Sequence, residues 1–184
     1  MPPKVRITKE RIVAAAVDIV RRQGADQLNA RSVAKELSCS TQPIFSNFTA
    51  MEELTHAVIA AAGALYREYA EKECQTGKYP PYKASGMAYI RFAREERELF
   101  KLLYMRDRSG DQTGDDGFGE ILQVVQRGTG LAGEKAELFH LEMWAAVHGI
   151  AVMVATGYLE LEEALISQML TDLFQGLKKQ YTEV

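Results

Sequence analysis

Cysteine is scarce in this 184-residue chain, and its two copies, Cys39 and Cys74, lie far apart without the spacing of metal ligands. We therefore expect no disulfide framework, and the composition suits a reducing compartment. No apolar run reaches the roughly 18 residues that a membrane span needs, and the first residues lack the apolar core of a signal peptide. The sequence thus predicts a cytoplasmic protein that contacts no membrane.

Patterns typical of catalysis are missing as well. The chain has no CxxC pair, no recognisable pairing of a nucleophile with a base, and no Gly-rich phosphate loop after a strand. His140 and His148 lie roughly 12 Å apart along a helix, which is too far for both to bind one metal ion. The sequence therefore predicts that the protein is not an enzyme and holds no metal or other cofactor.

Charge is distributed unevenly along the chain. The net charge of −3 divides into +4 for residues 1–48, which hold eight Lys or Arg, and −7 for the other 136 residues. Residues 1–48 thus form a basic head, and residues 49–184 form an acidic body. This asymmetry is typical of a protein that contacts phosphate at one end. Chance clustering of surface charge would give the same asymmetry. The pattern of residues within the head therefore decides between a phosphate-contacting segment and chance.

Apolar residues in the head recur at helical spacing. A stripe that begins at Ile12 predicts an amphipathic helix that Thr8 caps and Gly24 ends. Asn29 caps a second, short helix, and a third helix is expected from about residue 41 to 47. Two short helices joined by a tight turn and braced by a longer one form a helix-turn-helix.

The second short helix of such a unit enters the DNA major groove and places its N-terminal residues at the base edges. Here these residues are Ser40, Thr41 and Gln42, and the Gln42 amide matches N6 and N7 of adenine. Ile44 and Phe48 are expected to face inward. Many helical bundles contain similar turns, so periodicity alone leaves the function open.

The head also resembles a known family. The stretch ITKERIVAAAVDIVRRQGADQLNARSVAKELSCSTQPIFSNFTAMEEL, residues 7–54, resembles the TetR/AcrR DNA-binding domain without an insertion. The matching positions are Ile12, Ala15, Ala16, Gly24, Val33, Ala34, Ser40, Ile44, Phe48, Glu52 and Leu54. The resemblance implies an all-α protein of about nine helices. Residues 1–52 would form a three-helix DNA-binding domain, and residues 53–184 a helical ligand-binding and dimerisation domain.

Several residues depart from the family pattern. Asn29 replaces the usual Thr cap, and Ser38-Cys39 replaces Gly-Val in the turn, where a buried Cys39 is favoured over a redox switch. Phe45 replaces a Tyr and Met51 a Lys that contact phosphate, which weakens DNA affinity more than selectivity. The expected DNA-binding residues are Lys4, Arg6, Arg31, Lys35, Ser40, Thr41, Gln42, Phe45, Ser46 and Asn47.

Helical patterns continue through the acidic body. Thr49 and Glu52 form a capping box that opens a helix to about residue 74. Further helices are expected at about 82–95, 97–106, 118–128, 134–155 and 160–179, with a Gly/Asp-rich loop at residues 109–117. The segment MWAAVHGIAVMVATG, residues 143–157, resembles the Trp-x3-His-Gly signature of one TetR C-terminal class. In that class the last two helices pair with their symmetry mates.

The last helix supports a dimer independently of the resemblance. Its apolar stripe is too wide for one neighbour and comprises Leu161, Leu165, Met169 and Leu173, with Ile166, Leu170, Phe174 and Leu177 beside them. Such a face can bury against its own domain and against a second subunit, although the core helix of a monomer is the alternative. Because paired DNA half-sites favour paired proteins, we expect a homodimer.

Aromatic and polarizable side chains in the middle helices indicate an effector pocket. The candidates are Tyr89, Phe92, Phe100, Tyr104, Met105, Met143, Trp144 and His148. Trp144 and His148 are one helical turn apart and share a face, and a structural role in the core is the alternative for both. The expected effector is a small apolar or aromatic molecule.

Together these patterns predict a ligand-responsive transcriptional regulator that binds a palindromic operator in double-stranded DNA. We expect a repressor that the effector releases, although an activator would use the same fold. A helical enzyme or ligand carrier with an incidental helix-turn-helix is the alternative, and it leaves the basic head unexplained.

Overall fold

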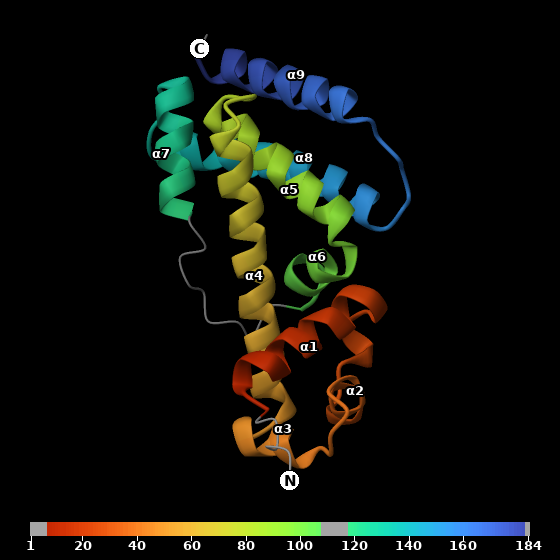
Figure 1. Cartoon of the computed structure of the whole chain (residues 1–184). Coiled ribbons are helices and arrows are strands. Elements are labelled where there is room, and N and C mark those ends of the chain that lie inside the picture. Colours follow the sequence, from red (N-terminus) through yellow and green to blue (C-terminus); the bar gives the residue numbers. More distant parts are fainter. Residues whose placement is uncertain (1–6, 108–117, 183–184) are drawn as a thin grey trace. The chain divides into compact units, whose positions relative to one another are not determined.

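Helices account for the whole architecture in the described part of the chain. The computed structural model describes residues 7–107 and 118–182, so the loop expected at residues 109–117 lies outside it. These ranges hold nine α-helices, one short 3-10 turn and no strand, which confirms the predicted all-α class (Figure 1). The helices are α1 (Lys9–Gln23), α2 (Ala30–Glu36), α3 (Gln42–Asn47), α4 (Met51–Gln75), α5 (Pro81–Glu95), α6 (Arg97–Tyr104), α7 (Phe118–Thr129), α8 (Glu134–Ala155) and α9 (Glu163–Thr182), and the 3-10 turn is Ala25–Gln27.

The helices divide into two compact units. The first comprises Met1–Tyr66 and Glu96–Arg106, and the second comprises Arg67–Glu95 and Asp107–Val184. The helix α4 therefore contributes to both units, and α6 belongs to the same unit as α1–α3. The functional boundary expected after residue 52 stays a prediction.

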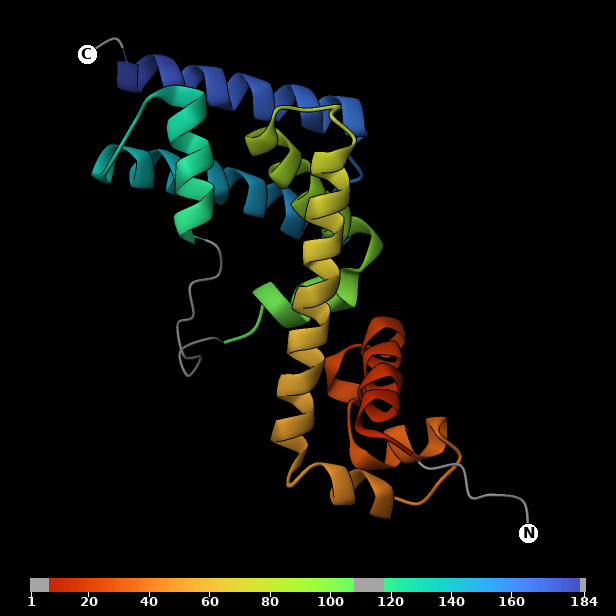
Figure 2. The ribbon, with the colours of Figure 1, turned by 60° about the vertical axis from the view of Figure 1, so that its left-hand side comes forward.

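In the first unit, α1 is an amphipathic helix with the expected ends. The Thr8 hydroxyl accepts a hydrogen bond from the Arg11 N–H at 3.4 Å, and Gly24 ends the helix at a φ of 88°. The positive φ explains the glycine, because a Cβ would clash there. The apolar stripe of α1 is buried, and α1 packs against α2, α3 and α6 (Figure 2).

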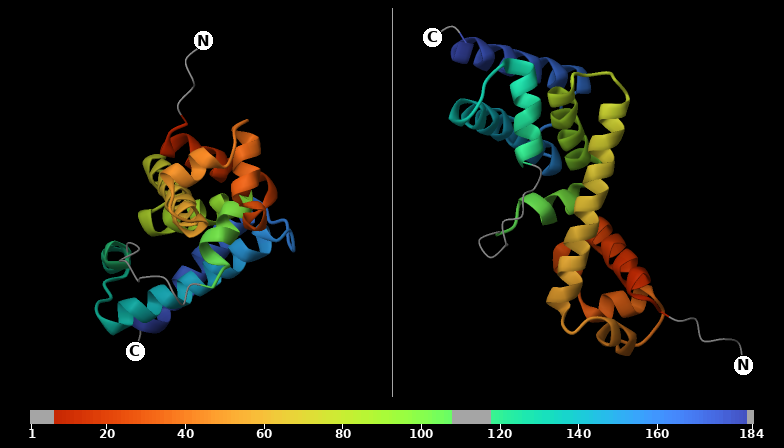
Figure 3. Two further views of the ribbon diagram at one scale, coloured as in Figure 1. Left: turned by 90° about the horizontal axis from the view of Figure 1, so that it is seen from below. Right: turned by 90° about the vertical axis from the view of Figure 1, so that its left-hand side faces the viewer.

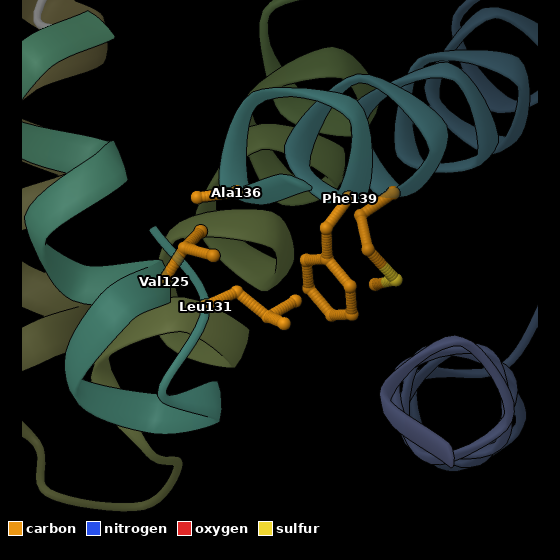
Figure 4. Close-up of a cluster of buried hydrophobic side chains, with 5 residues drawn as sticks. Val125, Leu131, Ala136 and Phe139 are labelled. Atoms are coloured by element: carbon orange, nitrogen blue, oxygen red, sulfur yellow. The ribbon is translucent and has the colours of Figure 1, made fainter. Parts of the chain in front are cut away.

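In the second unit, α5 and α8 form the most extensive helix pair, and α7 and α9 pack against both (Figure 3). The core at one end of this unit is centred on Phe139, which is fully buried with Val125 and Leu131 (Figure 4). The rings of Tyr82, Phe174 and Tyr181 surround it at centroid distances of 6.3, 5.5 and 6.0 Å. This unit is therefore held by aromatic packing among helices distant in sequence.

Candidate DNA-binding and effector sites

The turn between α2 and α3 is built by local capping. Asn29 Oδ1 accepts hydrogen bonds from the N–H groups of Arg31 and Ser32 at 3.1 and 3.0 Å, as the cap prediction requires. At the other end of α2, the Cys39 N–H donates to the Ala34 carbonyl at 2.9 Å, and Ser38 has a φ of 52°. This residue in the left-handed region reverses the chain so that α3 can start four residues later, at Gln42.

The helix α3 presents its N-terminal end to solvent. Ser40 and Gln42 are exposed and Thr41 is half-buried, whereas Ile44 and Phe48 are buried as expected. Pro43 lies in the first turn, where its missing N–H leaves no intrahelical bond unmade. The geometry therefore provides short polar groups and one amide at the end of a helix that is anchored from beneath.

The other expected DNA-binding residues differ in whether their polar atoms are already hydrogen-bonded within the protein. Arg31 and Lys35 are exposed on α2, and Phe45 is 52% exposed on α3. The Ser46 hydroxyl donates to the Gln42 carbonyl at 2.9 Å, and the Asn47 amide donates to the Pro43 carbonyl at 2.7 Å. These two donors are engaged within α3. Lys4 and Arg6 lie outside the described residues.

The start of α4 differs from the expected capping box. Glu53, and not Glu52, accepts hydrogen bonds from the Thr49 N–H at 2.8 Å and from the Thr49 hydroxyl at 3.1 Å. Its other oxygen pairs with Lys9 Nζ at 2.9 Å, and Lys9 also lies 4.7 Å from the Phe48 ring centroid. The Lys9 and Thr49 bonds lower the pKa of Glu53 from 4.5 to about 2. Glu53 therefore ties the start of α1 to the start of α4.

The start of α6 is fixed on the end of α1 within the first unit. Arg21 Nε lies 2.7 Å from Glu96 Oε2, and only 13% of the Glu96 side chain is exposed. The helix α6 then buries Leu99 and Phe100 completely. The sequence did not predict this contact, because Arg21 and Glu96 lie 75 positions apart along the chain.

The expected effector residues fall in both units. In the first unit Phe100 is buried, Tyr104 is half-buried with its ring centroid 5.2 Å from that of Phe100, and Met105 is 43% exposed. In the second unit Tyr89, Phe92 and Met143 are core residues, with exposures of 5%, 0% and 4%. A pocket formed by all eight residues stays a prediction.

Trp144 and His148 form a stack at the surface of the second unit. Their ring centroids are 5.0 Å apart with nearly parallel planes, and Trp144 is 44% exposed. His148 Nδ1 shares a hydrogen bond with the buried Tyr89 hydroxyl at 3.0 Å. Partial burial lowers the pKa of His148, which favours the neutral ring. An apolar surface next to a fixed polar atom is suited to binding an aromatic molecule.

The expected dimer face is partly uncovered. On α9, Leu165 is 50% and Leu173 is 37% exposed and Met169 is half-buried, whereas Leu161 is half-buried and lies two residues before the helix begins at Glu163. Two further leucines on α8, Leu138 at 48% and Leu141 at 56%, also lie open. We did not predict these two from the sequence, because α8 is apolar nearly all around and its pattern does not indicate which side is covered.

Comparison with known proteins decides the family. The profile described as "Tetracyclin repressor-like, C-terminal domain" matches residues 82–175. This chain belongs to the TetR family of transcriptional regulators. TetR family members regulate transcription and are not enzymes, and TetR-like regulators bind DNA and usually dimerise.

The relatives of this TetR family regulator cover most of its length. An uncharacterized HTH-type transcriptional regulator of Mycobacterium tuberculosis is 22% identical over 184 residues, or 96% of this chain and 84% of that protein. A TetR-like transcriptional regulator from a Rhodococcus species superposes with a TM-score of 0.69 at 20% identity, covering 95% of this chain and 96% of the other. A TetR family member from Streptomyces coelicolor gives 0.65 at 18% identity, covering 89% and 96%. The two solved structures share the fold.

One helix among the described residues meets the length and composition criteria of a membrane span. The helix α8 of this TetR regulator, with 22 residues, is long and apolar enough to cross a membrane by length and composition alone. The core helix of a soluble protein meets the same two criteria, and α8 buries Phe139, Met143 and Ile150. The helix is therefore weak evidence for a membrane contact.

Proposed function

We propose that this TetR regulator is a repressor that reads a palindromic operator through α3 and leaves it when a small apolar or aromatic molecule binds. The observation that carries the proposal is the exposed N-terminal end of α3, with Ser40 and Gln42 open to solvent above the buried Ile44. Polar groups at this position of a helix-turn-helix contact base edges in the major groove. The positive charge of residues 1–48 supports the same orientation toward DNA.

A homodimer is part of the proposal. One helix-turn-helix contacts one half-site, so a palindromic operator needs two copies related by two-fold symmetry. The exposed leucines of α8 and α9, Leu138, Leu141, Leu165 and Leu173, support an interface on the second unit. Exposed leucines of this kind are common at subunit contacts.

The response to an effector is proposed to pass through α5 and α6. The helix α5 ends at Glu95 in the second unit, and α6 begins at Arg97 in the first, where the Arg21–Glu96 pair holds its start on α1. An effector that binds beside the Trp144–His148 stack and favours one position of α5 would shift α6, and with it α1. Release requires that the effector bind the DNA-free arrangement more tightly than the DNA-bound one.

The experiment that tests the function is a binding selection from genomic DNA fragments with the purified protein at about 150 mM salt. Enrichment of a short palindrome is expected, and a reporter gene behind that palindrome should fall in expression when the regulator is present. A screen of aromatic and apolar molecules then tests whether one of them releases the DNA. Salt-sensitive binding to all fragments equally would contradict operator reading and favour the ligand carrier.

A further inference from the structure

Phe45 is a large apolar side chain on the open surface of α3. It is 52% exposed, whereas Phe48, three residues later, is 2% exposed and Ile44 is fully buried. Ile44 and Phe48 therefore anchor the helix, and the Phe45 ring contributes little to the core. Single exposed apolar residues are ordinary on a protein surface, so the surroundings of Phe45 on α3 decide its role.

The segment around Phe45 carries no charge. Residues 37–51 contain no Lys, Arg, His, Asp or Glu, and the exposed cations Arg31 and Lys35 lie on the preceding helix α2. Attraction between a protein and phosphate comes mainly from Lys and Arg side chains. The side chains of α3 are therefore suited to short-range contacts with base edges, through neutral groups, rather than to charge attraction along the DNA backbone.

Two of the neutral polar side chains of α3 are engaged within the helix. The Ser46 hydroxyl donates to the Gln42 carbonyl at 2.9 Å, and the Asn47 amide donates to the Pro43 carbonyl at 2.7 Å. The Gln42 side chain and the Phe45 ring are both exposed and lie three residues apart, so they share one face of α3. This face therefore presents one amide next to one apolar ring.

The DNA major groove offers one apolar group to such a ring. Thymine presents its C5-methyl group there, whereas the characteristic groups of the other bases are hydrogen-bond donors and acceptors. A ring placed on a G·C pair would remove water from these polar groups without replacing its hydrogen bonds. A ring placed on thymine would instead bury the methyl group. The same side chain thus favours thymine and disfavours G·C pairs.

We propose that Phe45 is a specificity-determining residue that selects a thymine beside the adenine contacted by Gln42. The inference rests on the proposed reading of an operator through α3, and it adds a base that each half-site must contain. Residues three positions apart are separated by about 4.5 Å along a helix axis, and successive bases by about 3.4 Å along DNA. The two contacts therefore fall on neighbouring bases, so each half-site holds an adenine and a thymine within one or two base steps.

The test compares thymine with deoxyuridine in the operator that the genomic selection identifies. Deoxyuridine lacks the C5-methyl group and keeps every hydrogen-bonding group of thymine, so only the apolar contact changes. Fluorescence anisotropy measures the affinity of the full chain for operators in which the thymines are replaced one at a time. At one position in each half-site the dissociation constant is expected to rise about fourfold, since the lost methyl group buries about as much apolar surface as one CH₂ group.

Four variants assign the methyl contact to its side chain, with circular dichroism as the check on folding. Phe45→Ala should bind the thymine operator more weakly than wild type and bind the thymine and deoxyuridine operators equally. Phe45→Leu keeps part of the apolar surface and should show a smaller difference than wild type. Gln42→Ala should bind more weakly and keep the fourfold difference, because the ring stays in place. Tyr158→Ala removes a 77% exposed ring from the second unit and, as the matched control, should change neither quantity.

The possible outcomes distinguish the inference from the proposed function. A difference between thymine and deoxyuridine that wild type shows and Phe45→Ala lacks supports the inference. An operator on which no deoxyuridine changes wild-type binding overturns the inference and leaves operator reading standing. A selection that enriches no palindrome overturns the proposed function and the inference together.

Two further results would assign the ring or the methyl group elsewhere. A difference that persists unchanged in Phe45→Ala means that another group contacts the methyl, and overturns the inference. Equal losses of Phe45→Ala on operator and unrelated DNA would place the ring on the DNA backbone, and also overturn it. If Phe45→Ala fails to fold, Phe45→Leu decides, and a full fourfold difference in that variant overturns the inference.

Discussion

At the residue scale, Ser38 carries backbone strain inside the DNA-binding turn. Its φ of 52° lies in the left-handed region, and it is the one non-glycine residue of the described ranges with a positive φ. For an L-residue this conformation brings Cβ close to a backbone carbonyl oxygen, a clash that glycine avoids. The TetR pattern has glycine in this turn, so Ser38 keeps the geometry at a loss of stability.

The variant Ser38→Gly is therefore expected to raise the free energy of unfolding by about 0.5–1 kcal/mol. The relief of backbone strain in the folded state outweighs the larger conformational entropy that glycine gives the unfolded chain. Equilibrium denaturation with urea measures the difference. Ser40→Gly, two residues later and without a positive φ, should lower stability. A loss of stability in Ser38→Gly would show that the turn is unstrained.

Glu53 controls the acid response of the first unit. Its pKa falls from 4.5 to about 2 because Lys9 and Thr49 hydrogen-bond to the ionised carboxylate. A lowered pKa in the folded state means that the charge stabilises the fold above pH 4.5, and that this contribution disappears as the pH falls toward 2. Sequence reasoning chose Glu52, because the capping box rule counts three residues from Thr49 and cannot include Lys9 from another helix.

The variant Glu53→Gln should melt at a lower temperature than wild type at pH 7, and the difference should shrink as the pH falls from 4.5 to 2. Thermal unfolding followed by circular dichroism at several pH values checks this. Glu52→Gln is the matched control and should leave the melting temperature nearly unchanged at every pH. A constant difference for Glu53→Gln across this range would contradict the role of its charge.

At the scale of elements, α3 is the helix that we propose to read the base edges. Gln42 is exposed at the first position of α3, and its backbone carbonyl is the acceptor for Ser46. Replacing the Gln42 side chain therefore leaves the internal bond of α3 in place. The helix was predicted within one residue, because its proline and its buried face lie close together in the chain.

Gln42→Ala is expected to weaken binding to the selected operator by about 1–3 kcal/mol while leaving binding to unrelated DNA nearly unchanged. Fluorescence anisotropy with both DNAs at one salt concentration measures the two affinities. Gln23→Ala, an exposed glutamine at the end of α1, is the matched control and should change neither affinity. Equal losses on both DNAs would mean that Gln42 only positions the helix.

The helix α2 offers the complementary test, since Arg31 and Lys35 are exposed on it and neither has a salt bridge among the described residues. Replacing either one with alanine should weaken binding to all DNA sequences alike. Loss of one phosphate contact per subunit should also reduce the slope of log affinity against log salt by about 0.9 per contact. Binding isotherms from 50 to 200 mM salt provide both quantities. An unchanged slope would place these residues away from DNA.

At the scale of the whole molecule, the proposed reading of a palindromic operator depends on pairing two subunits. Leu165 is 50% exposed on α9 and lies on the face proposed to contact the partner. A charge there would be buried without a partner in the dimer, although it would stay solvated in the monomer. This asymmetry makes the substitution a test of assembly rather than of folding.

Leu165→Asp should therefore yield a folded monomer whose specific operator affinity falls by roughly 1000-fold or more, toward the level of non-specific binding. Size-exclusion chromatography and operator titrations measure the two effects. Gln175→Asp adds the same charge to an exposed position of α9 away from the face, and should preserve both assembly and affinity. A Leu165→Asp protein that remains a tight dimer would place the interface elsewhere.

The sequence by itself determined the helices, the helix-turn-helix and the family. Helix boundaries agree with the predictions within about three residues, and the caps at Thr8 and Asn29 form as expected. This is because helix formation and capping depend on residues three or four positions apart, which the sequence shows directly. The resemblance in residues 7–54 rests on the same kind of local pattern.

Only the tertiary structure decided which groups meet across the chain. It assigned Glu53 rather than Glu52 to the start of α4, joined Glu96 to Arg21, and left Leu138 and Leu141 of α8 exposed. Each of these depends on side chains that lie tens of residues apart, or on which face of an almost wholly apolar helix is covered. Spacing along the chain carries no information about either, because packing between distant helices selects the contacts.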